Sequence, residues 1–170
     1  MSLGLYLHIP YCFSKCRYCD FYSHPGERGV PDAYVEALVR ELDRFAPERP
    51  LQPDTLYFGG GTPSLLRPEQ AKRLIDAARP MPGAEITLEA NPETVTEESL
   101  AGFREAGVNR ISFGVQSARD TQLRTLGRPH TAKQARAAFA AARRAGFANI
   151  SGDIMLALPP YTEAEFDETL

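Results

Sequence analysis

Short apolar runs alternate with segments of helical periodicity along most of the chain, and this order constrains the fold more than any other feature of the sequence. Residues 3–9 form the first apolar run, and later runs occupy residues 55–58, 86–88, 110–113 and 148–156. Between them, apolar side chains recur at helical spacing, first at Tyr34, Val35, Leu38, Val39, Leu42 and Phe45 and then within residues 68–78, 97–105 and 132–145. Such alternation is typical of parallel strands joined by helical crossovers.

Five βα units in succession favour a barrel or part-barrel over an open doubly wound sheet. Thr96 is the expected N-cap of the third helix, and Gly107 and Gly146 are expected to end the third and fourth. Residues 106–112 resemble residues 145–151, either because both lead from a helix end into a strand or by chance. Residues 162–170 begin a helical pattern that stops early, so we expect residues 1–170 to be the N-terminal part of a larger α/β barrel, truncated at its C-terminus.

Composition excludes several classes of protein. The 170 residues carry 19 Lys and Arg against 22 Asp and Glu, a formal net charge of −3, without a dense basic cluster, which argues against nucleic acid as a partner. The longest apolar runs fall far below the roughly 20 residues that span a bilayer. The first apolar run is too short for a signal peptide. We therefore expect a cytoplasmic protein that does not span a membrane.

Cys12, Cys16 and Cys19 are the three cysteines of the chain, and they lie within eight residues. An odd, clustered set in a chain without a secretion signal indicates metal or redox chemistry. Thiolates from one loop could hold three corners of a [4Fe–4S] cluster and leave the fourth iron open. The alternative is a zinc-stabilised binding module, with His8 or His24 as fourth ligand.

Polar and glycine positions follow the strand ends, where parallel α/β folds place their active loops. Gly59, Gly60 and Gly61 close the second strand, where a backbone without side chains can approach a ligand closely, although a tight turn is the simpler interpretation. Glu89 ends the third strand, where a lone carboxylate is usually solvated. Gln116, Arg128 and Asp153 should face the same end of the barrel.

The sequence around the cysteines, from Tyr6 to Phe21, identifies a protein family more specifically than the cysteine spacing alone. It resembles the radical S-adenosylmethionine (SAM) superfamily and, within it, the oxygen-independent coproporphyrinogen III oxidase-like branch. The likeness covers essentially the whole chain. It implies that the three cysteines bind the cluster and that nine residues contact SAM, namely Tyr6, Tyr18, Gly60, Gly61, Thr62, Glu89, Gln116, Arg128 and Asp153.

The resemblance also implies a mechanism. The open iron would bind the amino and carboxylate groups of SAM, and one electron from the reduced cluster would cleave it to methionine and a 5′-deoxyadenosyl radical. The protein would orient SAM and exclude water and oxygen, with no side chain needed as a general base. We expect His8 to pack or hydrogen-bond near the cluster. His24 and His130 are expected in exposed loops, with haem ligation as the alternative.

Two features separate this sequence from the decarboxylases of the branch. Those enzymes have a further cysteine two residues after the third, whereas Asp20 and Phe21 follow Cys19 here, and this chain reaches its first strand without a long N-terminal arm. Both features resemble the haem chaperones of the branch, which implies haem as ligand and respiratory proteins as acceptors. Three hypotheses stand: a haem carrier with a radical SAM core, a radical enzyme acting on a porphyrin-type substrate (oxygen-independent coproporphyrinogen III oxidase), and a zinc-stabilised module.

Overall fold

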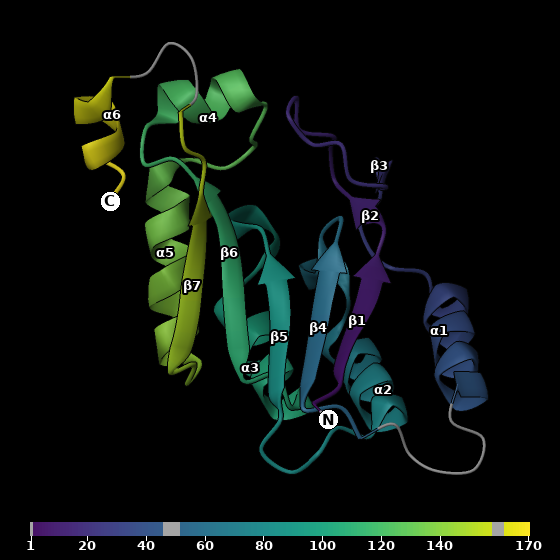
Figure 1. The fold of residues 1–170 in the computed structure, drawn as a ribbon. Helices are drawn as coiled ribbons and strands as arrows, with labels where there is room; N and C mark the ends of the chain where they lie inside the picture. Colours follow the sequence, from purple (N-terminus) through teal and green to yellow (C-terminus); the bar gives the residue numbers. More distant parts are fainter. Residues whose placement is uncertain (1, 46–51, 158–161) are drawn as a thin grey trace.

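A five-stranded parallel sheet forms the centre of the protein (Figure 1). The computed structural model describes residues 2–45, 52–157 and 162–170. The strands follow one another in the sheet in chain order: β1 (Gly4–Ile9), β4 (Thr55–Gly60), β5 (Glu85–Ala90), β6 (Arg110–Gln116) and β7 (Asn149–Ile154). This order is that of consecutive βα units in a barrel, so the predicted fold class is confirmed.

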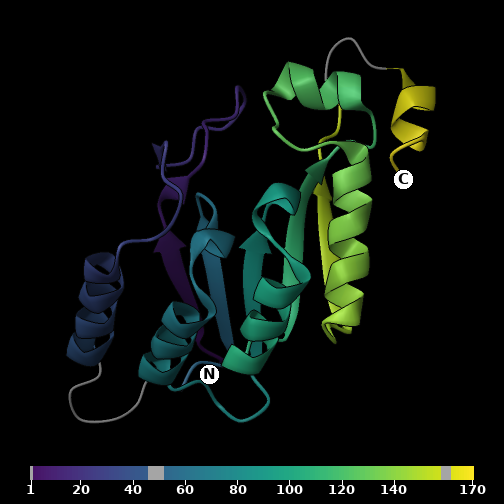
Figure 2. The same ribbon diagram turned by 180° about the vertical axis from the view of Figure 1, so that it is seen from behind.

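Helices cover one face of the sheet (Figure 2). They are α1 (Asp32–Phe45), α2 (Pro68–Ala78), α3 (Glu97–Ala106) and α5 (Ala132–Arg144). The predicted ends of α3 are confirmed, because the Thr96 side chain accepts a hydrogen bond from the Ser99 amide and Gly107 takes a left-handed conformation with φ of 113°.

The core lies between the sheet and these helices. Strand side chains alternate between the two faces, so every second residue points toward the helices. The largest fully buried apolar side chains come from both layers and include Phe58, Phe113 and Leu88 from strands and Phe103, Leu100 and Leu74 from helices. Burial of this continuous apolar layer gives the sheet a fixed register.

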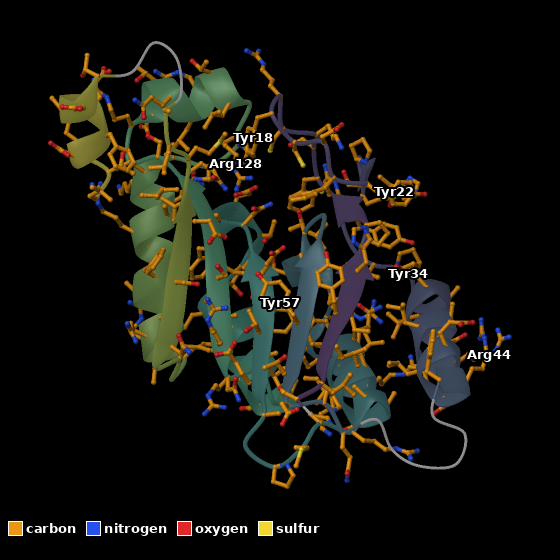
Figure 3. All side chains as sticks on the ribbon, in the orientation of Figure 1. Tyr18, Tyr22, Tyr34, Arg44, Tyr57 and Arg128 are labelled. Atoms are coloured by element: carbon orange, nitrogen blue, oxygen red, sulfur yellow. The ribbon has the colours of Figure 1, made fainter. Side chains whose placement is uncertain are left out.

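The opposite face of the sheet is polar. Arg110 donates hydrogen bonds to Ser151 at 2.9 Å and to Thr87 at 3.3 Å, and Ser112 donates to Asp153. Tyr57 stands on this face in the middle of the sheet (Figure 3). In a closed barrel this face is the interior, and its hydrogen-bonding groups make it a lining that tolerates polar ligands.

Short elements gather at the carboxyl end of the strands, and the sequence analysis did not identify most of them. They are the paired strands β2 (Tyr11–Cys12) and β3 (His24–Pro25), the 3₁₀ turns η1 (Pro63–Leu65) and η2 (Pro92–Thr94), and helix α4 (Asp120–Leu126). The expected C-terminal helix is α6 (Glu163–Asp167), capped by Thr162. Among the described residues, no helix is long and apolar enough to cross a membrane.

Candidate functional site

The cysteine loop begins directly where β1 ends and is fixed by backbone hydrogen bonds. The amide of His24 donates to the carbonyl of Pro10 at 2.6 Å, and the amide of Glu27 donates to that of Cys12 at 3.1 Å. Further along, the Cys19 amide donates to the Cys16 carbonyl. These bonds fold the loop back on itself and bring its sulfurs to one side.

Helix α4 holds the loop from across the sheet. The amide of Arg17 donates to the carbonyl of Leu126, the last residue of α4, at 3.0 Å. Gly127 has φ of 73°, and a side chain there would lie 3.2 Å from Cγ of Arg17. Both the left-handed backbone and this close approach favour glycine at the position. Residues more than 100 positions apart thus form opposite walls of one site.

One pocket lies between these walls and the carboxyl ends of the strands. All three cysteines line it. So do eight of the nine residues expected to contact SAM: Tyr18, Gly60, Gly61, Thr62, Glu89, Gln116, Arg128 and Asp153. Tyr18 and Arg128 lie next to each other at this end of the molecule (Figure 3). The predicted site residues are therefore brought together from the cysteine loop and from the ends of four strands and their loops.

The glycine segment lies against the first cysteine. The amide of Gly61 donates to the carbonyl of Ile9 at 2.9 Å. A Cβ atom at Gly61 would lie 2.8 Å from the carbonyl oxygen of Tyr11 and 3.0 Å from the sulfur of Cys12. Only a residue without a side chain permits this approach. The glycines thus act as a close-packing surface under the cysteine loop, which is more than the tight turn of the simpler interpretation.

Glu89 is half buried at the end of β5, rather than solvated as a lone carboxylate would be. It accepts a hydrogen bond of 2.7 Å from the hydroxyl of Tyr57. Burial raises the pKa of Glu89, and the hydrogen bonds from Tyr57 and the Gly60 backbone only partly oppose this. Burial and the bond to Glu89 raise the pKa of Tyr57 as well, so its phenol remains a donor at neutral pH.

Asp153 lies opposite Glu89 on the open face. It is exposed, and it accepts hydrogen bonds from the hydroxyl of Ser112 at 3.2 and 3.3 Å. Gln116 is the last residue of β6, not a residue after the strand, and it sits at an irregularity of the β6–β7 pairing with φ of 66°. Such a left-handed conformation in a non-glycine residue is uncommon and clusters at functional sites.

Arg128 is the buried cation of the site. Its guanidinium donates to the side-chain oxygen of Asn91 at 2.7 Å, to the carbonyl of Gly114 at 2.8 Å and to the sulfur of Cys16 at 3.5 Å. Burial lowers its pKa, but nearby Tyr18, Glu93 and Cys16 outweigh this and raise the pKa overall. Its Nε atom is buried without a partner in the described part of the chain. Because Nε is buried, the pocket does not reach it. The positive charge of the guanidinium that lines the pocket is what suits the site to an anionic ligand.

Tyr18 forms the rim of the pocket beside Arg128. Burial raises the pKa of its phenol to about 12, although the Arg128 cation acts in the opposite direction. Tyr18 therefore remains a neutral hydrogen-bond donor at physiological pH. An aromatic ring with one polar end, placed at the edge of a pocket, can both cover a ligand and hydrogen-bond to it.

Tyr6 is the one predicted contact residue that does not line the pocket. It is 54% exposed on the open face, stacked on Tyr57 with ring centroids 6.1 Å apart. Its hydroxyl lies 3.2 Å from Nδ1 of His8, whose other nitrogen lies 3.0 Å from the carbonyl oxygen of Tyr22. The expectation that His8 makes a hydrogen bond near the cysteine loop is confirmed.

The expectation for His130 is wrong, whereas His24 is exposed as expected. The His130 side chain is buried, with Nε2 3.1 Å from the Val115 carbonyl oxygen and Nδ1 3.2 Å from a carboxylate oxygen of Glu93. These two contacts place the segment before α5 against β6 and η2, although the geometry of the Glu93 contact does not make it a hydrogen bond. His130 is thus sequestered from any ligand at the surface.

Several pocket residues were missed by the sequence analysis. Asn91, Ser112 and Lys15 line the pocket directly. Lys15 also donates to the Phe21 carbonyl at 2.6 Å and so stabilises the cysteine loop. Tyr57 lies behind the pocket and donates a hydrogen bond to Glu89. Asn91 directly follows β5, and its position at a strand end was the available signal.

The donor set fits an iron–sulfur cluster. Three sulfurs line one pocket, and two of them receive hydrogen bonds, Cys12 from the hydroxyl of Thr62 at 3.4 Å and Cys16 from Arg128. Such donors stabilise negatively charged sulfur and tune a bound cluster. In the part of the chain that the structure describes, no three His, Cys, Asp or Glu side chains converge in the manner of ligands to a single metal ion.

The chain is similar to known proteins both in sequence and in structure. It is 44% identical to the heme chaperone HemW of Escherichia coli over 92% of this chain and 43% of the relative. It is 40% identical to the heme chaperone HemW of Bacillus subtilis over 97% of this chain and 45% of the relative. Among solved structures, the coproporphyrinogen III oxidase HemN from Escherichia coli, a radical SAM enzyme, superposes with a TM-score of 0.87 at 31% identity, covering 99% of this chain and 40% of that one.

The chain therefore spans less than half the length of these relatives. The family comparison matches residues 6–170, which include the cysteine loop and every strand end of the pocket. The resemblance first suggested by the cysteine loop is thus confirmed over nearly the whole sequence: the chain belongs to the radical SAM superfamily.

Proposed function

We propose that Cys12, Cys16 and Cys19 hold a [4Fe–4S] cluster and that SAM binds beside it in the same pocket. The observation that carries this proposal is the convergence of all three sulfurs with glycine backbone, two carboxylates and a buried arginine on one cavity. Three thiolates leave one iron of a cuboidal cluster without a protein ligand. That free position, next to polar groups from several strand ends, is suited to a charged cosubstrate.

When both are bound, the cluster and SAM would supply the radical chemistry of the superfamily, in which one electron from the reduced cluster would cleave the sulfonium of SAM to methionine and a 5′-deoxyadenosyl radical. The chain's own residues bind and orient. The carboxylates of Glu89 and Asp153 would accept hydrogen bonds from ribose hydroxyls or the ammonium group, and the positive charge of Arg128, which lines the pocket, would attract the carboxylate. Tyr18 would shield the site from water.

For the whole protein, we propose haem binding and delivery to acceptor proteins, with respiratory enzymes as the acceptors that the resemblance suggests. Two relatives at 40 and 44% identity are haem chaperones by name. In addition, the decarboxylases of the branch have a further cysteine two residues after the third, and Phe21 stands at that position here. No group in the pocket has to act as a general base for this function.

A second candidate is the oxidative decarboxylation of coproporphyrinogen III. It is favoured by the superposition on HemN, with a TM-score of 0.87. The same core supports many chemistries, however, and a shared fold does not fix the reaction. The missing fourth cysteine makes the chaperone the preferred proposal.

One experiment separates the two candidates, and it uses the full-length protein. Haemin titration under anaerobic conditions should give a saturable Soret band at one haem per chain. Incubation with reduced cluster, SAM and coproporphyrinogen III should give no protoporphyrinogen by mass spectrometry. Multiple turnovers would instead establish the decarboxylase, and absence of saturable haem binding would contradict the chaperone.

A further inference from the structure

Asn91 lies between the two side chains that donate to the cysteine sulfurs. Its amide nitrogen is 3.1 Å from the hydroxyl oxygen of Thr62, and its side-chain oxygen is 2.7 Å from a guanidinium nitrogen of Arg128. Thr62 in turn donates to Cys12, and Arg128 donates to Cys16. One amide thereby links the hydrogen bonds to two of the three sulfurs.

The direction of these hydrogen bonds is fixed by chemistry. A guanidinium has donors only, so the atom of Asn91 that faces Arg128 must be the oxygen. The NH₂ group of Asn91 then faces Thr62 and donates to its hydroxyl oxygen. That oxygen becomes an acceptor toward Asn91, and the hydroxyl proton is left free to point at the sulfur of Cys12.

Asn91 is itself held rigidly. Its backbone carbonyl accepts hydrogen bonds from the amide of Thr94 at 3.0 Å and from the Thr94 hydroxyl at 2.8 Å, and its amide donates to the hydroxyl of Ser64. A Cβ atom at Gly114 would lie 3.1 Å from the Asn91 side-chain oxygen and 3.2 Å from the Arg128 guanidinium. Glycine at that position allows the pair to meet.

We propose that Asn91 is a positioning residue that sets the reduction potential of the cluster by orienting Thr62 and Arg128 toward the sulfurs. This rests on the proposed cluster at Cys12 and Cys16. Hydrogen bonds to the sulfurs stabilise the extra negative charge of the reduced cluster and so raise its potential. Loss of the amide frees the Thr62 hydroxyl to turn away and leaves the Gly114 carbonyl as the remaining oxygen acceptor that holds the Arg128 guanidinium, so the reduced form loses part of that stabilisation.

The test measures the potential of the SAM-free cluster by electron paramagnetic resonance during a dithionite titration of the full-length protein, with iron content as a check on loading. The variants are Asn91→Leu, Thr62→Val and the double variant. Asn149→Leu is the control, because Asn149 is exposed at the start of β7, at the end of the strand away from the pocket. Asn91→Ser is a second probe, since its short hydroxyl cannot reach both Thr62 and Arg128 and it adds no charge beside the cluster.

We expect Asn91→Leu to lower the potential by at least a tenfold change in the reduction equilibrium, about 59 mV for one electron. The effect should be smaller in the Thr62→Val background, and Asn149→Leu should match wild type. If Asn91→Leu fails to load, Asn91→Ser must show the lowered potential. Fully loaded Asn91 variants at the wild-type potential, or shifts that add fully to that of Thr62→Val, overturn the inference. A wild-type protein without a cluster overturns the proposed function as well.

Discussion

Replacing Glu89 with Gln should weaken SAM binding while leaving the fold intact. Glu89 is half buried, and the Tyr57 hydroxyl and the Gly60 backbone together occupy only part of the roughly four acceptor sites of a carboxylate, so it can still accept from the ligand. A hydrogen bond to a charged group contributes roughly 1.5 to 3 kcal/mol, which is about a 13- to 160-fold change in affinity. Tyr57 can still donate to the amide oxygen in the variant.

The pH dependence gives a second test of the same residue. Burial raises the pKa of Glu89 above its ordinary value of 4.5. The folded state therefore takes up the proton more readily than the unfolded chain, so the contribution of Glu89 to stability is full below the unfolded pKa and is lost as pH rises through the folded pKa. SAM binding has the opposite sign, because the carboxylate is the better acceptor: affinity should fall as pH falls through the raised pKa.

The assay is calorimetric titration of anaerobically reconstituted protein with SAM across a pH series. The matched control is Glu85→Gln, which changes an exposed carboxylate on the same face of the same strand, outside the pocket. Glu89→Gln should bind SAM weakly and lose the acid-side decline in affinity, with unchanged iron content. Normal SAM affinity in Glu89→Gln, or an equal loss in Glu85→Gln, would refute the assignment.

Two further predictions concern the scaffold. Gly61→Ala should reduce cluster loading several-fold in an iron assay, because the new Cβ would lie 2.8 Å from the Tyr11 carbonyl oxygen. The control is Gly29→Ala, whose Cβ would meet its nearest atom at 4.0 Å and which should therefore load normally. His130→Ala should lower the free energy of unfolding by about 1 to 3 kcal/mol, because the Val115 carbonyl loses its hydrogen bond from the buried imidazole. An unchanged urea midpoint would contradict this prediction.

The fold was largely predictable because its signals are local. Each strand of the five-stranded sheet was found within a few residues of its observed bounds; for example, residues 110–113 were expected where β6 extends to Gln116. Among the extra residues, Gly114 and Gln116 line the pocket and interrupt the apolar pattern. Helix α4 was missed because seven residues span barely two turns, and so short a segment has little periodicity.

The site was predictable where a residue follows a strand, and less so where its role depends on a distant partner. The strand ends and the resemblance together led to Glu89 and Asp153. Tyr57, by contrast, lies in the middle of β4, and only the register of β4 on β5 brings it to Glu89. His130 was misjudged because the loop composition around it indicates exposure, whereas the pairing with Glu93 arises only in three dimensions.

The most direct test of the account is elemental analysis after anaerobic reconstitution with iron and sulfide. We expect about four iron and four sulfide per chain, because three cysteines hold one cuboidal cluster, together with a broad visible charge-transfer absorption that is lost when Cys12, Cys16 and Cys19 are replaced by Ser. Stoichiometric zinc without that absorption would contradict the account and leave the zinc-stabilised module in its place.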